Sequence, residues 1–195
     1  MTEPALESRV SLPMDDLFEA IDEYFLSPDR LVKIEAFTHA QRQVEGWFKG
    51  ELIYLFADLL GAERLSAWEP EAVLTPGDKK KCDFILNVLD SRVFLEVKAL
   101  YHGKQRAAKF GLDIYMYKDT VGIWGDVLKL SSLSSGFGYN LLFIYPRPEP
   151  DVWARLIEKY KRRIAPIALE EVSRISDYPR ELYICKLRVT GRSRS

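Results

Sequence analysis

The sequence has few of the residues that usually bind zinc or form disulfides. Its 195 residues include two cysteines, Cys82 and Cys185, and two histidines, His39 and His102. The cysteines lie far apart and form no CxxC pair, which argues against a structural zinc site. Each falls in an apolar run typical of a strand, which indicates a buried thiol. We therefore expect a protein of a reducing compartment, the cytoplasm.

The chain also lacks long apolar runs and an excess of charge of either sign. No stretch of about 18 apolar residues occurs, so we expect no transmembrane helix. The acidic start, MTEPALESRVSLPMDD, has no apolar run typical of a signal peptide. The 28 basic and 29 acidic residues give a formal net charge of -1. A general non-specific coat for DNA is therefore not indicated, and any nucleic-acid surface must be a local basic patch.

What the chain does contain is enough apolar material for a folded core. Hydrophobic residues make up 47% of it and charged residues 29%, which argues against general disorder. The length suits one domain. We expect an N-terminal extension with one helix over residues 1–37, an α/β domain over 38–190 and a frayed tail over 191–195.

Apolar spacing predicts helices first and then strands mixed with helices. The expected helices cover 13–26, about 38–60, 121–133 and about 151–163. The expected strands cover 72–74, 82–89, 92–100, 139–145 and 181–189, while residues 104–118 give no clear pattern. This order predicts a mixed central β-sheet flanked by helices on both faces.

Three polar residues are expected to meet on one face of the hairpin over 82–100. Glu96 and Lys98 share a face because side chains alternate along a strand. A two-residue turn at Asp90-Ser91 pairs Ile85 with Glu96 and Asp83 with Lys98, so Asp83 joins them. The opposite face is entirely apolar: Phe84, Leu86, Val88, Val93, Leu95 and Val97.

Two carboxylates and a lysine at one point suit the hydrolysis of a phosphodiester bond. Carboxylate oxygens are good ligands for Mg²⁺ or Mn²⁺, which acidify a bound water and stabilise charge on a phosphate. A lysine beside them can position or deprotonate the water, or neutralise the phosphate. The alternative is an ordinary cross-strand salt bridge. The apolar setting VFLEVKAL argues against it, because polar residues in such a run are costly unless used or paired.

The segment from Asp83 through VFLEVKA resembles the core of the PD-(D/E)-x-K nuclease superfamily of restriction endonucleases, junction resolvases and repair nucleases. In that pattern an Asp precedes a hairpin and the next strand carries E-x-K, here Glu96-Val97-Lys98. Cys82 replaces the family's Pro. The resemblance, which covers about residues 40–146, implies a restriction-endonuclease-like core and a metal-dependent endonuclease. Asp83 and Glu96 would be its metal ligands and Lys98 its catalytic lysine.

Many members of this superfamily also have an acidic residue on the helix before the hairpin. The segment Lys49-Gly50-Glu51-Leu52 resembles that helix. Glu51 borders the apolar stripe that begins at Val44, so we expect it to be a third catalytic, metal-side carboxylate. Glu45, at the opposite edge of the stripe, is the rival. The alternative for both is a solvated charge at the edge of a helix.

Lysines near the hairpin are candidates for contacts with nucleic acid. Lys80, Lys81 and Lys104 flank it in sequence, which suits contacts with phosphates. Lys129 lies on the helix expected over 121–133, close to Asp126. Some superfamily members carry a basic residue there that reaches the site. The alternatives are solubilising surface charge for the first three and a surface ion pair for Lys129.

The resemblance implies DNA, duplex or branched, as the partner, and RNA stays open. It also implies a homodimer, since cutting two strands needs two sites. A second hypothesis is a catalytically inactive relative that binds nucleic acid or serves in assembly. A third is a structural or interaction protein with an accidental E-x-K, which predicts that Asp83, Glu96 and Lys98 are exposed and far apart.

Overall fold

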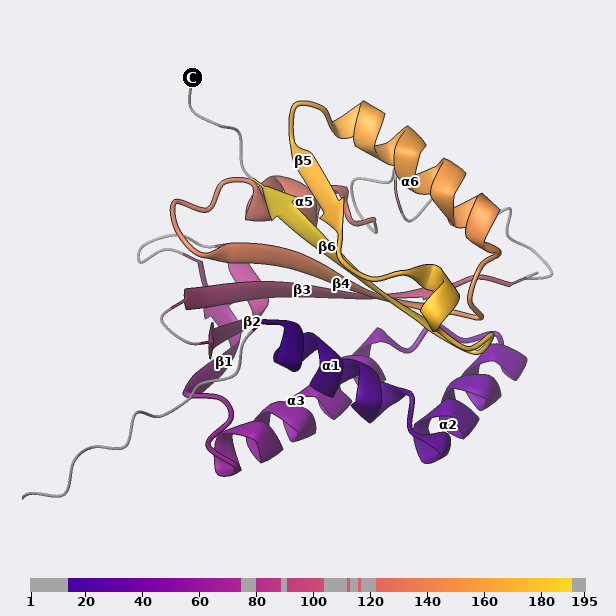
Figure 1. Cartoon of the computed structure of the whole chain (residues 1–195), viewed down its shortest axis with the longest axis horizontal. Coiled ribbons are helices and arrows are strands. Elements are labelled where there is room, and N and C mark those ends of the chain that lie inside the picture. Colours follow the sequence, from indigo (N-terminus) through magenta and orange to yellow (C-terminus); the bar gives the residue numbers. More distant parts are fainter. Residues whose placement is uncertain are drawn as a thin grey trace, which may run out of the picture.

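A six-stranded sheet with helices on both faces organises the chain (Figure 1). The computed structural model describes residues 14–74, 80–88, 91–103, 112, 116 and 122–190. The strand order is β1-β2-β3-β4-β6-β5. β3 and β4 pair in parallel and the other neighbours are antiparallel. The predicted α/β class with a mixed sheet is confirmed. The strands are β1 (Ala67–Val73), β2 (Lys81–Val88), β3 (Ser91–Tyr101), β4 (Phe137–Tyr145), β5 (Ala168–Glu171) and β6 (Tyr183–Thr190).

Aromatic side chains join one face of the sheet to the N-terminal helices α1 (Met14–Phe25), α2 (Pro28–His39) and α3 (Glu45–Gly61). The ring of Phe48 on α3 stacks on Phe143 of β4 with centroids 4.2 Å apart. The ring of Phe18 on α1 meets Tyr139 at 5.0 Å. Since Tyr139 and Phe143 lie an even number of residues apart on β4, they share this face. In Figure 1, α1 and α3 lie below the sheet.

The other face carries α5 (Trp124–Leu130) and α6 (Pro150–Ile164). Trp153 of α6 packs edge-on against Tyr183 of β6, with ring centroids 5.5 Å apart. At Gly138 of β4, an added Cβ would lie 3.0 Å from the Cβ of Leu130 on α5, so the missing side chain lets α5 lie close to the sheet. In the described part of the chain, every helix is too short or too polar to cross a bilayer.

A buried ion pair fastens α1 to β6. Lys186 is 3% exposed, and its ammonium contacts the carboxylate of Asp22 and the hydroxyl of Tyr178, the latter at 2.9 Å. Burial lowers the pKa of Lys186, although the nearby carboxylate of Asp22 acts to raise it. Burial likewise raises the pKa of Asp22. The N-terminal helix is thus tied to the far half of the sheet.

The register of the β2–β3 hairpin differs from the prediction by two residues. Val88 pairs with Ser91 and Phe84 with Leu95, whereas the prediction pairs Ile85 with Glu96. Because side chains alternate with a period of two, a two-residue shift keeps the same residues on each face. Continuing the register sets Asp83 opposite Glu96 instead of Lys98. The predicted apolar face is confirmed, with at most 3% exposure for Phe84, Leu86, Val88, Val93, Leu95 and Val97.

The predicted helix over 38–60 was wrong at its start. Residues 28–39 form α2, and α3 begins only at Glu45, so residues 14–39 contain two helices instead of one. Pro28 lies in the first turn of α2, where the N–H that proline lacks is not needed. Gln41 then adopts a positive φ of 52°, which interrupts the helical path. β1 is longer than predicted, and β5 was not predicted.

Candidate active site

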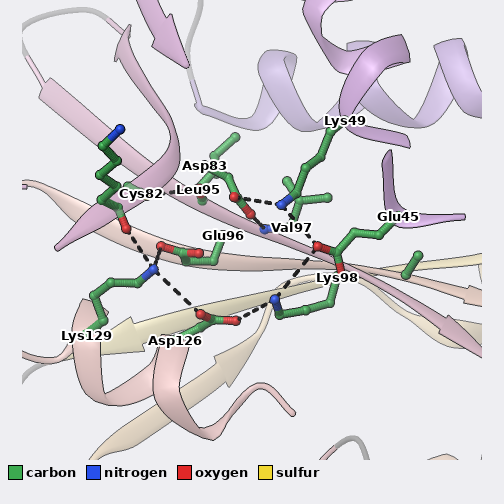
Figure 2. A network of polar contacts seen from close by, with 12 residues as sticks. Glu45, Lys49, Cys82, Asp83, Leu95, Glu96, Val97, Lys98, Asp126 and Lys129 are labelled. Atoms are coloured by element: carbon green, nitrogen blue, oxygen red, sulfur yellow. Dashed lines mark hydrogen bonds and ion pairs between the residues drawn. The ribbon is translucent and has the colours of Figure 1, made fainter. Parts of the chain in front are cut away.

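Seven charged side chains meet where β2 begins and β3 ends. Figure 2 shows them pointing toward one another from two strands and two helices. β2 and β3 supply Asp83, Glu96 and Lys98, which confirms that these three lie together and contradicts the expectation of an accidental, dispersed E-x-K. We call the whole set the acid–lysine cluster: Glu45, Lys49, Asp83, Glu96, Lys98, Asp126 and Lys129.

Asp83 is fixed by the end of the β2–β3 ladder. Its Oδ2 accepts a hydrogen bond of 2.8 Å from the backbone N–H of Val97, just beyond the last ladder pair. Its Oδ1 accepts another of 2.8 Å from Lys49 Nζ. The carboxylate thus takes the place of a backbone partner and holds the two strand ends together.

Glu96 is the most buried carboxylate of the cluster, with 2% exposure. Its Oε1 forms an ion pair with Lys129 Nζ. Burial, with the negative charge of Asp126, raises the pKa of Glu96 to about 7, although Lys129 opposes this. Burial acts to lower the pKa of Lys129, but Glu96 outweighs burial and raises that pKa. Glu96 therefore lies in a place where negative charge is poorly compensated.

Near the end of β3, Lys98 connects helix α5, through Asp126, to helix α3, through Glu45. Lys98 Nζ lies 3.5 Å from Asp126 Oδ2 on α5 and 3.8 Å from Glu45 Oε1 on α3. Asp126 Oδ2 is buried and has no hydrogen-bond partner among the described residues. Burial raises the pKa of Asp126, with Lys98 and Lys129 opposing it. Asp126 thus joins the site, although the sequence pattern marked it only as a neighbour of Lys129.

The helix carboxylate of the cluster is Glu45, and the prediction of Glu51 is not supported by the geometry. Glu45 Oε1 lies 3.0 Å from Lys49 Nζ. Glu51 instead accepts hydrogen bonds from Tyr24 at 2.9 Å and from Arg30 Nε at 3.0 Å. The reason is the helix α2 that the prediction missed, because Arg30 on α2 pairs with this carboxylate. Glu51 therefore links α3 to α1 and α2.

The predicted phosphate-binding lysines divide into three cases. Lys129 lies inside the cluster, where its Nζ also donates to the backbone oxygen of Lys81 at 2.8 Å. Its partner Glu96 is buried, so the pair is internal and not the surface pair considered above. Lys80 and Lys81 have exposed side chains at the start of β2. Lys104 lies outside the described residues.

A buried amide accompanies Glu96 on the neighbouring strand. Asn140 of β4 pairs in register with Glu96, so their side chains share a face. Asn140 is fully buried, and neither its Oδ1 nor its Nδ2 has a hydrogen-bond partner in the described ranges. Such groups are costly to bury. The sequence did carry a signal, since Asn140 is the one polar side chain between the tyrosines of YNLLFIY, where an unused amide would be unfavourable.

The chemistry of the donors fits a hard divalent cation. Across the described ranges, no group of three or more Asp, Glu, His or Cys residues is arranged for one as it stands. Lysine ammonium groups lie between the carboxylates instead (Figure 2). The raised pKa values of Glu96 and Asp126 both reflect burial and neighbouring carboxylates that the lysines do not fully offset. A cation such as Mg²⁺ that prefers oxygen ligands would supply that charge.

Comparison of the chain with protein-family models, with curated proteins and with solved structures gives no match. The function is therefore inferred from the geometry and chemistry of the acid–lysine cluster.

Proposed function

We propose that this protein is a metal-dependent nuclease with a restriction-endonuclease-like core, which hydrolyses phosphodiester bonds of DNA at the acid–lysine cluster. One observation carries the proposal. The three residues of the Asp…Glu-x-Lys pattern converge with Asp126 at the strand ends, and Glu96 is 2% exposed there. Excess buried negative charge is not expected in a network that only stabilises the fold, because replacing buried ion pairs by apolar residues is often neutral or favourable for stability.

Asp83, Glu96 and Asp126 are the residues that would hold Mg²⁺ or Mn²⁺. When bound, the ion supplies an acidified water and neutralises charge on the phosphate. Glu96 must lose its proton to act as a ligand, and its pKa of about 7 makes affinity for the metal fall as the pH drops below that value.

The lysines would exchange partners when substrate and metal arrive. Lys49 and Lys129 now neutralise Asp83 and Glu96. With a cation on these carboxylates, the two ammonium groups would be free to contact phosphate oxygens, the role expected for Lys129 from the sequence. Lys98 lies between Glu45 and Asp126 with a side chain 22% exposed, so it can reach both solvent and substrate. Its role is to orient the attacking water and to neutralise the charge that develops on the phosphate.

The proposal takes duplex or branched DNA as the substrate, with RNA as a further substrate to test. It also includes a homodimer, for cleavage of both strands, and a cytoplasmic location, with which the free, buried thiols of Cys82 and Cys185 are compatible.

The test is cleavage of supercoiled plasmid, branched DNA and RNA in Mg²⁺ and in Mn²⁺. We expect cleavage that EDTA abolishes, and we expect Asp83→Ala and Lys98→Ala each to reduce the rate by roughly a hundredfold or more. Glu158→Gln, on the exposed side of α6, is the control and should cut like wild type. If folded wild-type protein cuts none of these substrates but binds them, an inactive nucleic-acid-binding module replaces the nuclease.

A further inference from the structure

A pocket lies beside the acid–lysine cluster on the same face of the sheet. It has a volume of about 500 Å³ and is formed by β1, β2 and the start of β3. This volume is in the range of sites for small organic ligands. The side chains that matter for its chemistry are Ser66, Glu69, Ile85, Asn87, Ser91 and Arg92.

The strand register places this pocket in line with the cluster. Asn87 of β2 pairs with Ala67 of β1 and with Arg92 of β3, which makes one row across the three strands. Along β2, Asp83 lies four residues before Asn87 and on the same face. At about 3.3 Å per residue, Asn87 lies about 13 Å from Asp83. That distance corresponds to about four steps of a stacked nucleic-acid strand at 3.4 Å each.

The pocket combines a positively charged side chain, an apolar wall and polar side chains that can form hydrogen bonds with the edge of a base. The exposed Arg92 has its guanidinium 5.3 Å from the Phe94 ring centroid, and it forms no ion pair with any described residue. An exposed arginine whose guanidinium forms no ion pair can bind a phosphate through two parallel hydrogen bonds. Ile85, 4% exposed, supplies the apolar wall. Glu69 accepts hydrogen bonds, and Asn87 both donates and accepts them.

We propose that this pocket receives one unpaired nucleotide of the substrate strand, with its phosphate on Arg92 and its base edge on Glu69 and Asn87. The proposal rests on the nuclease function proposed above. Carboxylates accept hydrogen bonds from the amino group of cytosine, and asparagine pairs with adenine. Glu69 would repel a phosphate, so the phosphate lies on the Arg92 side. A base that is stacked and paired cannot turn its faces and edge into a pocket. The pocket therefore narrows the proposed substrate from duplex or branched DNA to DNA that exposes unpaired nucleotides, such as branch points and single strands.

The experiment measures fluorescence anisotropy of a short labelled DNA strand and of the same strand in a duplex. Both are titrated with the full chain in Ca²⁺, over a series of salt concentrations. We expect the single strand to bind more tightly than the duplex. Arg92→Ala should weaken binding of the single strand by roughly tenfold and reduce the slope of log K against log salt by about one. Arg155→Ala is the matched control, an exposed arginine on α6 at the other end of the sheet.

Cleavage of the same DNA in Mg²⁺ is measured in parallel. If wild type cuts DNA but Arg92→Ala binds like Arg155→Ala, the nucleotide pocket is refuted and the nuclease stands. Tighter binding of the duplex than of the single strand also refutes the pocket. If folded wild type neither binds nor cuts either form, both proposals fail.

Discussion

Replacing Glu96 by Gln should change how the stability of the protein depends on pH. Burial raises the pKa of Glu96 from its ordinary value of 4.5 to about 7. Each pKa unit corresponds to 1.36 kcal/mol, so the shift is worth about 3 kcal/mol. Because the folded state holds this proton more tightly than the unfolded chain, the favourable contribution is fully present below about pH 4.5. It is lost as the pH rises through about 7.

The assay is urea unfolding in EDTA at a series of pH values from about 4.5 to 8, for wild type and for Glu96→Gln. Gln keeps the shape of the side chain and has no proton to lose. The difference in unfolding free energy between wild type and variant should therefore shift by about 3 kcal/mol across this range. Wild type should lose stability relative to the variant as the pH rises. Glu158→Gln controls for the loss of a surface carboxylate.

Stability curves of wild type and Glu96→Gln that stay parallel over this range would contradict a raised pKa of Glu96. A gain in the stability of wild type relative to the variant as the pH rises would contradict it as well, since a carboxylate well compensated by Lys129 would have a lowered pKa and the opposite slope.

Two further predictions concern the buried ion pairs. At about pH 8, Lys129→Met should destabilise the protein by about 1–3 kcal/mol, because it removes the ion-pair partner of buried Glu96, which must then take up a proton or stay unpaired. In a Glu96→Gln background the same change should cost much less, and equal costs in urea unfolding would show that the two side chains are not coupled. Asp22→Ala should lower the free energy of unfolding by about 3 kcal/mol in the same assay, because it removes the carboxylate partner of buried Lys186. The double variant Asp22→Asn with Lys186→Met should recover most of that loss, because no buried charge is left unpaired. A loss that the double variant does not recover would contradict this explanation.

The convergence of Asp83, Glu96 and Lys98 was predictable because it depends on strand alternation alone. The predicted hairpin register was wrong by two residues, yet the face assignment survived, since an even shift returns each side chain to the same side. The turn itself was the weak point. Asp90 and Ser91 look like turn residues, but Ser91 pairs with Val88 as the first residue of β3.

The helix carboxylate could not be chosen from the sequence. Glu45 and Glu51 lie at opposite edges of the apolar stripe of α3, so periodicity gives both a similar place. What separates them is tertiary structure, because Tyr24 and Arg30 bind Glu51. Arg30 lies on α2, a helix that the prediction missed and that begins at Pro28. A proline in the first turn of a helix is as typical as one after its end.

Asp126 and Asn140 show what sequence patterns leave out. The spacing of Asp126 and Lys129 predicted a pair on one helix, and they lie 3.6 Å apart, but nothing in the pattern gave the angle at which α5 meets β3. Gly138 decides that approach by leaving room for Leu130. Asn140 lies beside Glu96 only because β4 pairs in parallel with β3, a long-range contact that local sequence does not encode.

Calorimetric titration of the EDTA-treated protein with Mn²⁺ at about pH 8 tests the central claim most directly, that the acid–lysine cluster is a site for a divalent cation. We expect saturable binding by wild type that Asp83→Asn and Glu96→Gln abolish. Glu51→Gln should keep it, because Glu51 contacts Tyr24 and Arg30 instead. No binding by folded wild type, or binding that Glu96→Gln leaves unchanged, would contradict the account.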